Sequence, residues 1–224
     1  MTHGSFVSPD TRDRIRGLAV PVATALGRLG LTPNALTVIG FAGTAAAAAA
    51  AAYQQWILAG VLVLAFGIFD LFDGALARAT GTASKFGAFL DSTLDRTGES
   101  LVLAGVAVGC AAVGFVEGVL AAGVAATFAS SVTYTRAKAE SLGVHGEVGV
   151  APRPERLVLL AIGLIVAGWG DVRIVQAPGS TCIESCIQPG GLGLLAMLAL
   201  IAILSAVTVV QRILHVKKQL DKQP

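Results

Sequence analysis

Long apolar stretches separated by short polar connections dominate this chain. Six of them are long enough, or nearly so, to cross the roughly 30 Å hydrocarbon core of a bilayer as helices. They cover residues 34–53, 56–77, 86–110, 115–137, 157–171 and 191–213. Residues 9–30 differ, because there apolar residues recur at helical spacing among four arginines, as in an amphipathic helix lying on a membrane surface. The pattern predicts an all-α integral membrane protein with six transmembrane helices and an N-terminal amphipathic helix.

The same pattern sets the expected organisation of the chain. We expect a tail and juxtamembrane helix over residues 1–30, a six-span domain over 31–216 and a basic tail over 217–224. Composition agrees, since 54% of residues are hydrophobic, 13% are charged and the mean hydropathy is +0.76. These values exclude an ordinary soluble protein and make the lipid bilayer the expected surroundings, with no nucleic-acid partner.

The basic residues divide unevenly between the two sides of such a six-span protein. One side would hold only Arg173. The other would hold Arg12, Arg14, Arg16, Arg28, Arg78, Lys85, Arg136, Lys138, Arg153, Arg156, Arg212, Lys217, Lys218 and Lys222. Cytoplasmic loops carry the excess of Lys and Arg. The distribution therefore predicts a multi-pass protein of the plasma (inner) membrane with both termini in the cytoplasm.

Four carboxylates inside strongly apolar sequence indicate where the chemistry lies. Asp70 and Asp73 are three residues apart, and Asp91 and Asp95 are four apart, so each pair shares one face of a helix. If the two helices lie side by side, the four carboxylates converge near the cytoplasmic face. Divalent cations relieve the repulsion of such a group, and all-oxygen ligation suits Mg²⁺, Mn²⁺ or Ca²⁺. Ionisable groups at membrane depth are functional by default.

These aspartates belong to a longer pattern over residues 70–95, D-x2-D-G-x2-A-R-x8-G-x3-D-x3-D. It resembles the signature of the CDP-alcohol phosphotransferase family at every fixed position. The resemblance implies an enzyme that passes the phosphatidyl group of a CDP-activated lipid to an alcohol and releases CMP. It implies metal ligands at Asp70, Asp73 and Asp91, for two Mg²⁺ or Mn²⁺ ions. The general base would be Asp95, which can also contact metal, and the enzyme would be a homodimer.

The resemblance also suggests residues for the nucleotide. The first span begins Pro-Asn-x-x-Thr, as in the family, which makes Asn34 and Thr37 candidates for the pocket wall; plain helix capping is the alternative. The donor-binding candidates together are Asn34, Thr37, Asp73, Gly74, Ala77, Arg78 and Gly87.

A second cluster of basic residues lies at the inner ends of the last three spans, in residues 131–140, 153–157 and 210–212. Arginines there are often membrane anchors. The segments resemble the prokaryotic phosphatidylinositol-phosphate synthases of the same family, which implies inositol 1-phosphate as acceptor. Its phosphate would be held by Thr133, Arg136, Arg156 and Arg212. Here the chain reads Arg-Ala-Lys where many relatives read Lys-Ala-Arg, so glycerol 3-phosphate remains an alternative acceptor.

Several alternatives stay open on the sequence alone. A divalent-cation carrier would also need buried carboxylates, but its site usually lies near the bilayer midplane and the basic cluster would have no role. The donor can be CDP-diacylglycerol or the ether-linked CDP-archaeol. Cys182 and Cys186, in the connection before the last span, can form a disulfide.

Overall fold

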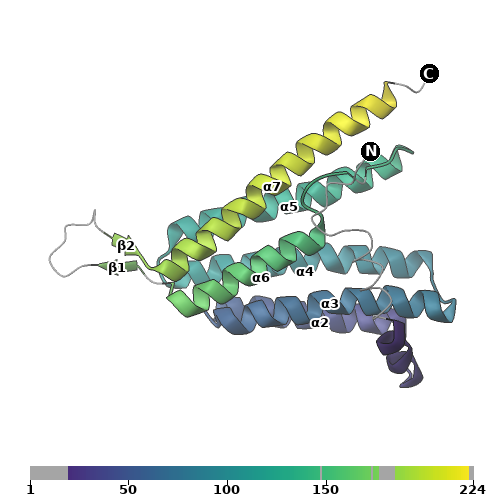
Figure 1. The fold of residues 1–224 in the computed structure, drawn as a ribbon, viewed down its shortest axis with the longest axis horizontal. Coiled ribbons are helices and arrows are strands. Elements are labelled where there is room, and N and C mark those ends of the chain that lie inside the picture. The colour runs from purple at the N-terminus through teal and green to yellow at the C-terminus, as the bar shows by residue number, and fades with distance from the viewer. Residues whose placement is uncertain (1–19, 147, 173, 177–184, 222–224) are drawn as a thin grey trace.

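Six long helices make up the body of the protein. The computed structural model describes residues 20–146, 148–172, 174–176 and 185–221, without the side chains of 70, 71, 174–176 and 185–187. After a helical segment over residues 20–28, the long helices follow in order (Figure 1): α2 (Pro33–Ala52), α3 (Trp56–Thr80), α4 (Lys85–Ala112), α5 (Val116–Ser141), α6 (Arg153–Gly170) and α7 (Pro189–Leu220).

Local sequence signals fix the ends of the helices that carry the aspartates. Thr32 caps α2, because its Oγ1 accepts a hydrogen bond from the Ala35 N–H at 3.2 Å, and Pro33 occupies the first turn. Gly81 ends α3 with a φ of +65°, a backbone conformation that favours glycine. Ser84 then caps α4 by accepting from the Gly87 N–H at 3.0 Å. The α3–α4 connection is therefore short and well defined.

The all-helical membrane architecture is confirmed, and the number of spans is confirmed in part. Four helices of the described chain, α2, α3, α5 and α7, are long and apolar enough to cross a membrane. The prediction that α4 and α6 also cross stays a prediction, because α4 carries five charged residues within its first 15 residues and α6 carries three within its first four. The connection before α7 contains two short antiparallel strands that the sequence analysis did not predict, β1 (Ile174–Gln176) and β2 (Ser185–Ile187). The possible disulfide involves Cys182 and the side chain of Cys186, which lie outside the description.

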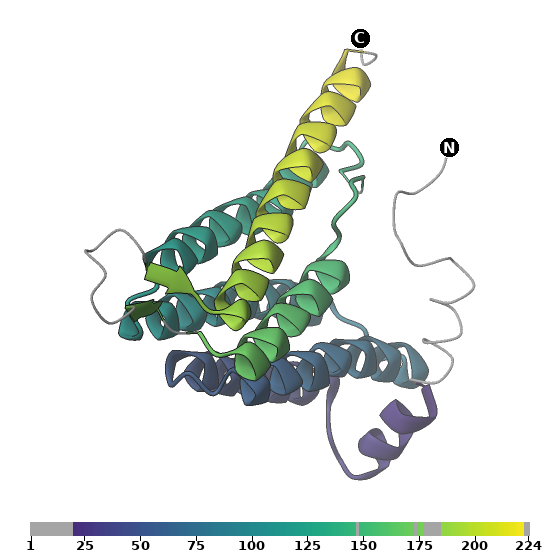
Figure 2. The same cartoon turned by 60° about the vertical axis from the view of Figure 1, so that its left-hand side comes forward.

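The helices pack as a ring. Helix α2 packs against α3 and α4, α5 packs against α4 and α7, and α6 packs against α3 and α7 (Figures 1 and 2). The alanine-rich run of α2 allows a close contact with α4, since a Cβ on Gly105 or Gly109 of α4 would overlap the carbonyl oxygens of Ala48 and Ala51. Close backbone packing therefore holds α2 between the two helices that carry the aspartate signature.

The ring brings one end of every long helix together. The start of α2, the end of α3, the starts of α4 and α6, and the ends of α5 and α7 lie at the end of the bundle remote from the β strands (Figure 1). We call this the signature end. The segment over residues 20–28 is attached here, with Ala23 and Leu26 packed among Leu36 and Leu76. All the candidate site residues lie on the helix halves nearest this end.

Candidate active site

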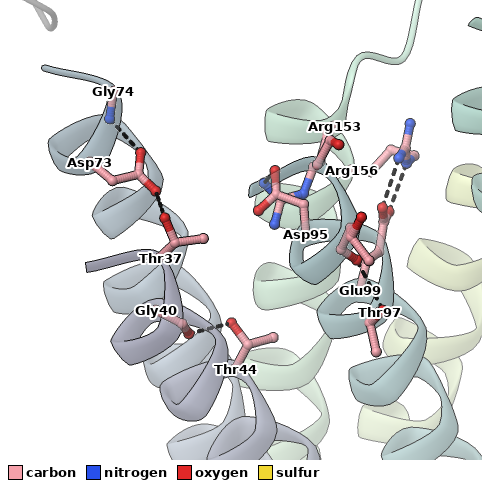
Figure 3. Close-up of polar contacts among 12 residues, drawn as sticks. Thr37, Gly40, Thr44, Asp73, Gly74, Asp95, Thr97, Glu99, Arg153 and Arg156 are labelled. Atoms are coloured by element: carbon pink, nitrogen blue, oxygen red, sulfur yellow. Dashed lines mark hydrogen bonds and ion pairs between the residues drawn. The ribbon is translucent and has the colours of Figure 1, made fainter. Parts of the chain in front are cut away.

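Helices α2 and α3 together fix the second aspartate of the signature. Asp73 is only 6% exposed, and its Oδ2 accepts a hydrogen bond from Thr37 Oγ1 at 2.8 Å (Figure 3). Its Oδ1 accepts from the N–H of Gly74 at 2.5 Å. The carboxylate is therefore buried and oriented by two donors. Thr37, a candidate for the nucleotide pocket, lies at this site and orients a predicted metal ligand.

The starts of α2 and α4 approach each other closely at another pair of candidate residues. A Cβ on Gly87 would lie 3.1 Å from Asn34 Oδ1 and equally close to Ser84 Oγ, so a side chain at this position would crowd both. On α3, a Cβ on Gly74 would lie 3.3 Å from the guanidinium of Arg78, which therefore folds back over that glycine. The two signature glycines leave space beside polar side chains, as a bound nucleotide would require.

The predicted general base is paired with an arginine from another helix. Asp95 Oδ2 on α4 lies 2.5 Å from Arg153 Nη1 in the first turn of α6 (Figure 3). Each of the two side chains is 21% exposed. A charge-assisted contact this short balances the charge of Asp95 while leaving the pair open to solvent or ligand.

One turn further along both helices lies a second ion pair, and this one is buried. Glu99 accepts hydrogen bonds from Arg156 Nε and Nη2, both at 2.8 Å, and Arg156 Nη1 donates to the Ala151 carbonyl at 2.9 Å. The side chains are 7% and 1% exposed. Because Asp95 and Glu99 share a face of α4, and Arg153 and Arg156 share a face of α6, the two pairs bind the start of α6 to α4.

The buried pair predicts a large stability effect. Replacing Glu99 by Ala would leave the Arg156 guanidinium buried without its carboxylate, and we expect a loss of about 3–5 kcal/mol in the free energy of unfolding. The matched control is Glu140→Ala, which breaks the exposed Arg136–Glu140 pair on α5 and should change stability by about 0.5 kcal/mol or less.

Unfolding in detergent, titrated with denaturant for both variants, measures this difference. The double variant Glu99→Leu/Arg156→Met should recover most of the loss, because no unpaired charge then remains buried. Equal destabilisation by Glu99→Ala and Glu140→Ala would contradict a structural role for the buried pair.

Arg212 on α7 holds the connection between α5 and α6. Its Nε donates to the Val148 carbonyl at 2.8 Å, and its Nη1 donates to the Val132 carbonyl. One turn earlier, Thr208 Oγ1 accepts from the Ala151 N–H at 3.1 Å. Arg156 and Arg212 therefore hold opposite ends of the segment over residues 148–151, which supports the first turn of α6.

The two candidates on α5, Thr133 and Arg136, make hydrogen bonds within their own helix. Arg136 is exposed and its Nε donates to Glu140 on its own helix at 2.8 Å. Thr133 Oγ1 donates to the Ser130 carbonyl at 2.8 Å. An open groove of about 360 Å³ between α5 and α7 is lined on α5 by other residues, among them Tyr134 and Lys138. Thr133 and Arg136 thus occupy a different part of the surface of α5 from the groove.

Sequence reasoning missed two residues of this site, Arg153 and Glu99. Spacing could have marked both as candidates, since Glu99 lies four residues after Asp95 and Arg153 three before Arg156, but it does not show that the two helices pair. The convergence of the four carboxylates stays a prediction. Among the side chains that the structure describes, no three acidic, histidine or cysteine groups come close enough to hold a metal ion, and the side chain of Asp70 is not among them.

Comparison with known proteins agrees with the signature. Residues 30–216 match the family model described as CDP-alcohol phosphatidyltransferase. The chain belongs to this family. It is therefore a CDP-alcohol phosphatidyltransferase of phospholipid biosynthesis and a multi-pass membrane protein.

Named relatives within the family cover nearly the whole chain. An archaetidylinositol phosphate synthase of Pyrococcus horikoshii is 34% identical over 216 residues, which is 94% of this chain and 96% of the relative. A phosphatidylinositol phosphate synthase of Cutibacterium acnes is 35% identical over 200 residues, with 88% and 91% covered.

Solved structures show the same fold. The phosphatidylinositol phosphate synthase of Mycobacterium tuberculosis with CDP-DAG bound superposes with a TM-score of 0.73 at 30% identity, covering 88% of this chain and 92% of that one. The same enzyme in complex with manganese and citrate gives a TM-score of 0.72 at 29% identity, covering 88% of each chain. The family resemblance inferred from the signature is confirmed.

Proposed function

We propose that this enzyme transfers the phosphatidyl group of CDP-diacylglycerol, or the equivalent group of CDP-archaeol, to inositol 1-phosphate. The products would be a phosphatidylinositol phosphate and CMP. Relatives named for such products, one archaeal and one bacterial, cover most of this chain at about 35% identity. Their names support an inositol phosphate acceptor and leave the lipid of the donor open.

The observation that carries the proposal is the contact between Arg153 and Asp95, 2.5 Å long. An acceptor whose hydroxyl reaches Asp95 would find a guanidinium beside it, and Arg156 and Arg212 lie behind the same turn of α6. Arginine matches the geometry of phosphate oxygens, so this arrangement favours an alcohol that also carries a phosphate. A divalent-cation carrier would have no use for these arginines.

The carboxylate ligands that this site offers suit a hard divalent cation. Asp73 offers a buried carboxylate oriented by Thr37, and the signature adds carboxylates at Asp70 and Asp91. We propose that these residues hold two Mg²⁺ or Mn²⁺ ions. When bound, such ions neutralise charge on the donor pyrophosphate and on departing CMP.

Different residues of the protein would bind the CDP-lipid donor and the alcohol acceptor. Asp95 would accept the proton of the acceptor hydroxyl, and it can also contact metal. Asn34, Thr37, Gly74, Ala77, Arg78 and Gly87 would border the nucleotide. Thr133, Arg136, Arg156 and Arg212 would form the acceptor side; Arg156, being buried, would mainly fix the turn that carries Arg153. We place this site at the cytoplasmic face of the plasma membrane, in a homodimer.

A panel of acceptors tests the proposal directly. The purified enzyme in detergent receives CDP-diacylglycerol, Mg²⁺ or Mn²⁺, and one of four alcohols: inositol 1-phosphate, free inositol, glycerol 3-phosphate or glycerol. Mass spectrometry of the lipid product, with CMP release as the rate, should give phosphatidylinositol phosphate with the first acceptor at the highest kcat/KM. Preferential formation of phosphatidylglycerophosphate would establish the alternative acceptor instead.

Arg136 gives a clean test of the acceptor side, because it is exposed and its loss should not unfold the protein. A charge-assisted hydrogen bond contributes about 1.5–3 kcal/mol, so Arg136→Ala should raise the acceptor KM roughly 10- to 100-fold. Donor affinity should not change. Lys138→Ala, which removes the same charge from the groove side of α5, is the matched control. If the KM for the acceptor is the same in Arg136→Ala as in Lys138→Ala, Arg136 does not bind the acceptor and is a surface anchor.

A further inference from the structure

We propose that Gln219, in the last turn of α7, is a positioning residue for the acceptor, because it fixes the connection between α5 and α6 (residues 142–152). That connection touches each of the three arginines proposed for the acceptor side. The inference therefore rests on the proposed function, and it adds a residue that lies outside both the aspartate signature and the basic cluster. Gln219 acts on the choice of acceptor through the connection and does not itself touch the substrate.

Gln219 pairs with the backbone of His145 in both directions. Its Oε1 accepts a hydrogen bond from the His145 N–H at 3.1 Å, and its Nε2 donates to the His145 carbonyl at 2.7 Å. His145 lies in neither a helix nor a strand, so its backbone groups need partners from elsewhere. One amide side chain supplies both, because it carries an acceptor and donors together. The contact ties the first part of the connection to the end of α7.

Two other side chains of α7 hold the rest of the connection, which Figure 2 shows as the irregular trace between the end of α5 and the start of α6. Arg212 Nε donates to the Val148 carbonyl at 2.8 Å, and Thr208 Oγ1 accepts from the Ala151 N–H at 3.1 Å. Positions 208, 212 and 219 share one face of α7, and the backbone groups that they bind recur at 145, 148 and 151. Residues 208 to 219 span about 16 Å of helix, and residues 145 to 151 reach at most about 22 Å when extended, so the connection has little slack along α7.

Two glycines allow the connection to lie this close to its neighbours. Gly149 has a φ of +136°, which favours glycine, and a Cβ there would overlap the side chain of Thr208. Thr208 is itself oriented, since its hydroxyl donates to the Leu204 carbonyl at 2.8 Å. A Cβ on Gly146 would lie 3.1 Å from Arg136 Cα and 3.2 Å from the Arg136 carbonyl oxygen. The connection is therefore packed against both α7 and the end of α5.

The connection joins the acceptor residues of three helices. It contacts Arg136 of α5, Arg212 of α7 and Arg156 of α6, at its residues 146, 148 and 151 respectively. Side chains from separate helices select one alcohol over another only if the distances between them are fixed, and a misplacement of about 1 Å can reduce the rate by roughly 100-fold. The connection sets these distances, and Gln219 holds the part of it that leaves α5.

The consequence is a role in selecting the acceptor. Inositol 1-phosphate and glycerol 3-phosphate share a phosphate and differ in the carbon skeleton that joins it to the reacting hydroxyl. Fixed acceptor residues favour one skeleton, because only one places the hydroxyl correctly when the phosphate is bound. Loss of the Gln219 contact loosens the connection and lowers this discrimination. Binding of the CDP-lipid donor does not depend on the connection and stays the same.

Competition between the two acceptors tests this role. The purified enzyme in detergent receives CDP-diacylglycerol, Mg²⁺ and equal concentrations of inositol 1-phosphate and glycerol 3-phosphate, and mass spectrometry gives the ratio of the two lipid products. In Gln219→Ala the ratio should shift toward phosphatidylglycerophosphate by about 10-fold, within the roughly 100-fold that a misplacement of 1 Å can cost. The KM for CDP-diacylglycerol should not change. Because only folded enzyme forms product, a loss of stability alone leaves the ratio as it is.

Two further variants separate the amide group from the rest of the side chain and from its position on the helix. Gln219→Met keeps the length of the side chain without its hydrogen bonds, and it should shift the ratio as Gln219→Ala does. Lys218→Ala, an exposed neighbour on α7, is the matched control and should give the wild-type ratio.

Hydrogen–deuterium exchange shows whether Gln219 holds the connection. The His145 amide of the wild type should exchange slowly, because it donates to the Gln219 side chain. Gln219→Ala should speed exchange in a peptide covering residues 142–151 and leave exchange in α4 unchanged, as expected for a local opening.

An unchanged product ratio in Gln219→Ala, a wild-type ratio in Gln219→Met, or unchanged exchange in the connection would each overturn the inference. Failure of the proposed function is recognised separately, because the wild type alone reports it. In that case the wild type would itself prefer glycerol 3-phosphate or form no phosphatidylinositol phosphate.

Discussion

Asp73→Asn and Asp91→Asn should each reduce phosphatidyl transfer by more than about 100-fold. Loss of a residue that merely supports a metal ligand typically reduces affinity or activity by about 10- to 100-fold, so loss of an anionic ligand should exceed that range. The folded protein should persist, because Asn at position 73 still offers one oxygen to the Thr37 hydroxyl, which donates to Asp73 at 2.8 Å, and only the hydrogen bond from the Gly74 N–H is lost. If the four carboxylates converge as predicted, removing one of their negative charges also carries no large penalty.

Two measurements check this prediction. Transfer is followed by CMP release over a titration of Mg²⁺ or Mn²⁺, and Mn²⁺ affinity is measured separately by electron paramagnetic resonance. Asp221→Asn, an exposed residue at the end of α7, makes the same chemical change outside the signature and should leave both readouts unchanged. Substantial activity in Asp91→Asn with an unaltered metal dependence would show that Asp91 is not a metal ligand.

The elements of the fold were largely predictable because the sequence marks them locally. Apolar runs gave the six long helices to within a few residues at most ends, and Pro33 and Gly81 stand where helices begin and end. The arrangement of the helices could not be predicted from the composition. The close contact of Gly105 and Gly109 with Ala48 and Ala51 depends on which small-residue faces meet, and many faces of this chain are rich in Gly and Ala.

The aspartate signature was predictable for a different reason, since fixed residue types at fixed spacing report a shared chemistry. The residues that pair with the signature aspartates were not predictable from the sequence. Asp95 and Glu99 are four residues apart and Arg153 and Arg156 are three apart, so each pair shares a helix face, but spacing within a helix does not say which helix lies opposite. The packing of α6 in the ring brings these two faces together and assigns Arg153 to Asp95 and Arg156 to Glu99.

The structure also separates residues that the sequence treats alike. Arg136, Arg156 and Arg212 all lie at the inner ends of predicted spans, yet their exposure ranges from 46% for the Arg136 side chain to 6% for Arg212 and 1% for Arg156. A buried arginine must have its N–H groups paired. The carbonyls of Val148 and Ala151 supply part of that pairing, so two of the three arginines also hold the connection that starts α6.

Asp95→Asn should lower kcat by about 100- to 10,000-fold, the range over which a positioned general base contributes. The donor should still bind, because Asn is the same size and can accept the hydrogen bond from Arg153 that Asp95 now receives. Equilibrium binding of CDP-diacylglycerol, together with single-turnover kinetics at saturating inositol 1-phosphate, separates binding from chemistry. Leu94→Ala, beside it on the same helix, controls for local disturbance of α4. Joint loss of donor binding and turnover in Asp95→Asn would identify Asp95 as an essential metal ligand rather than the base.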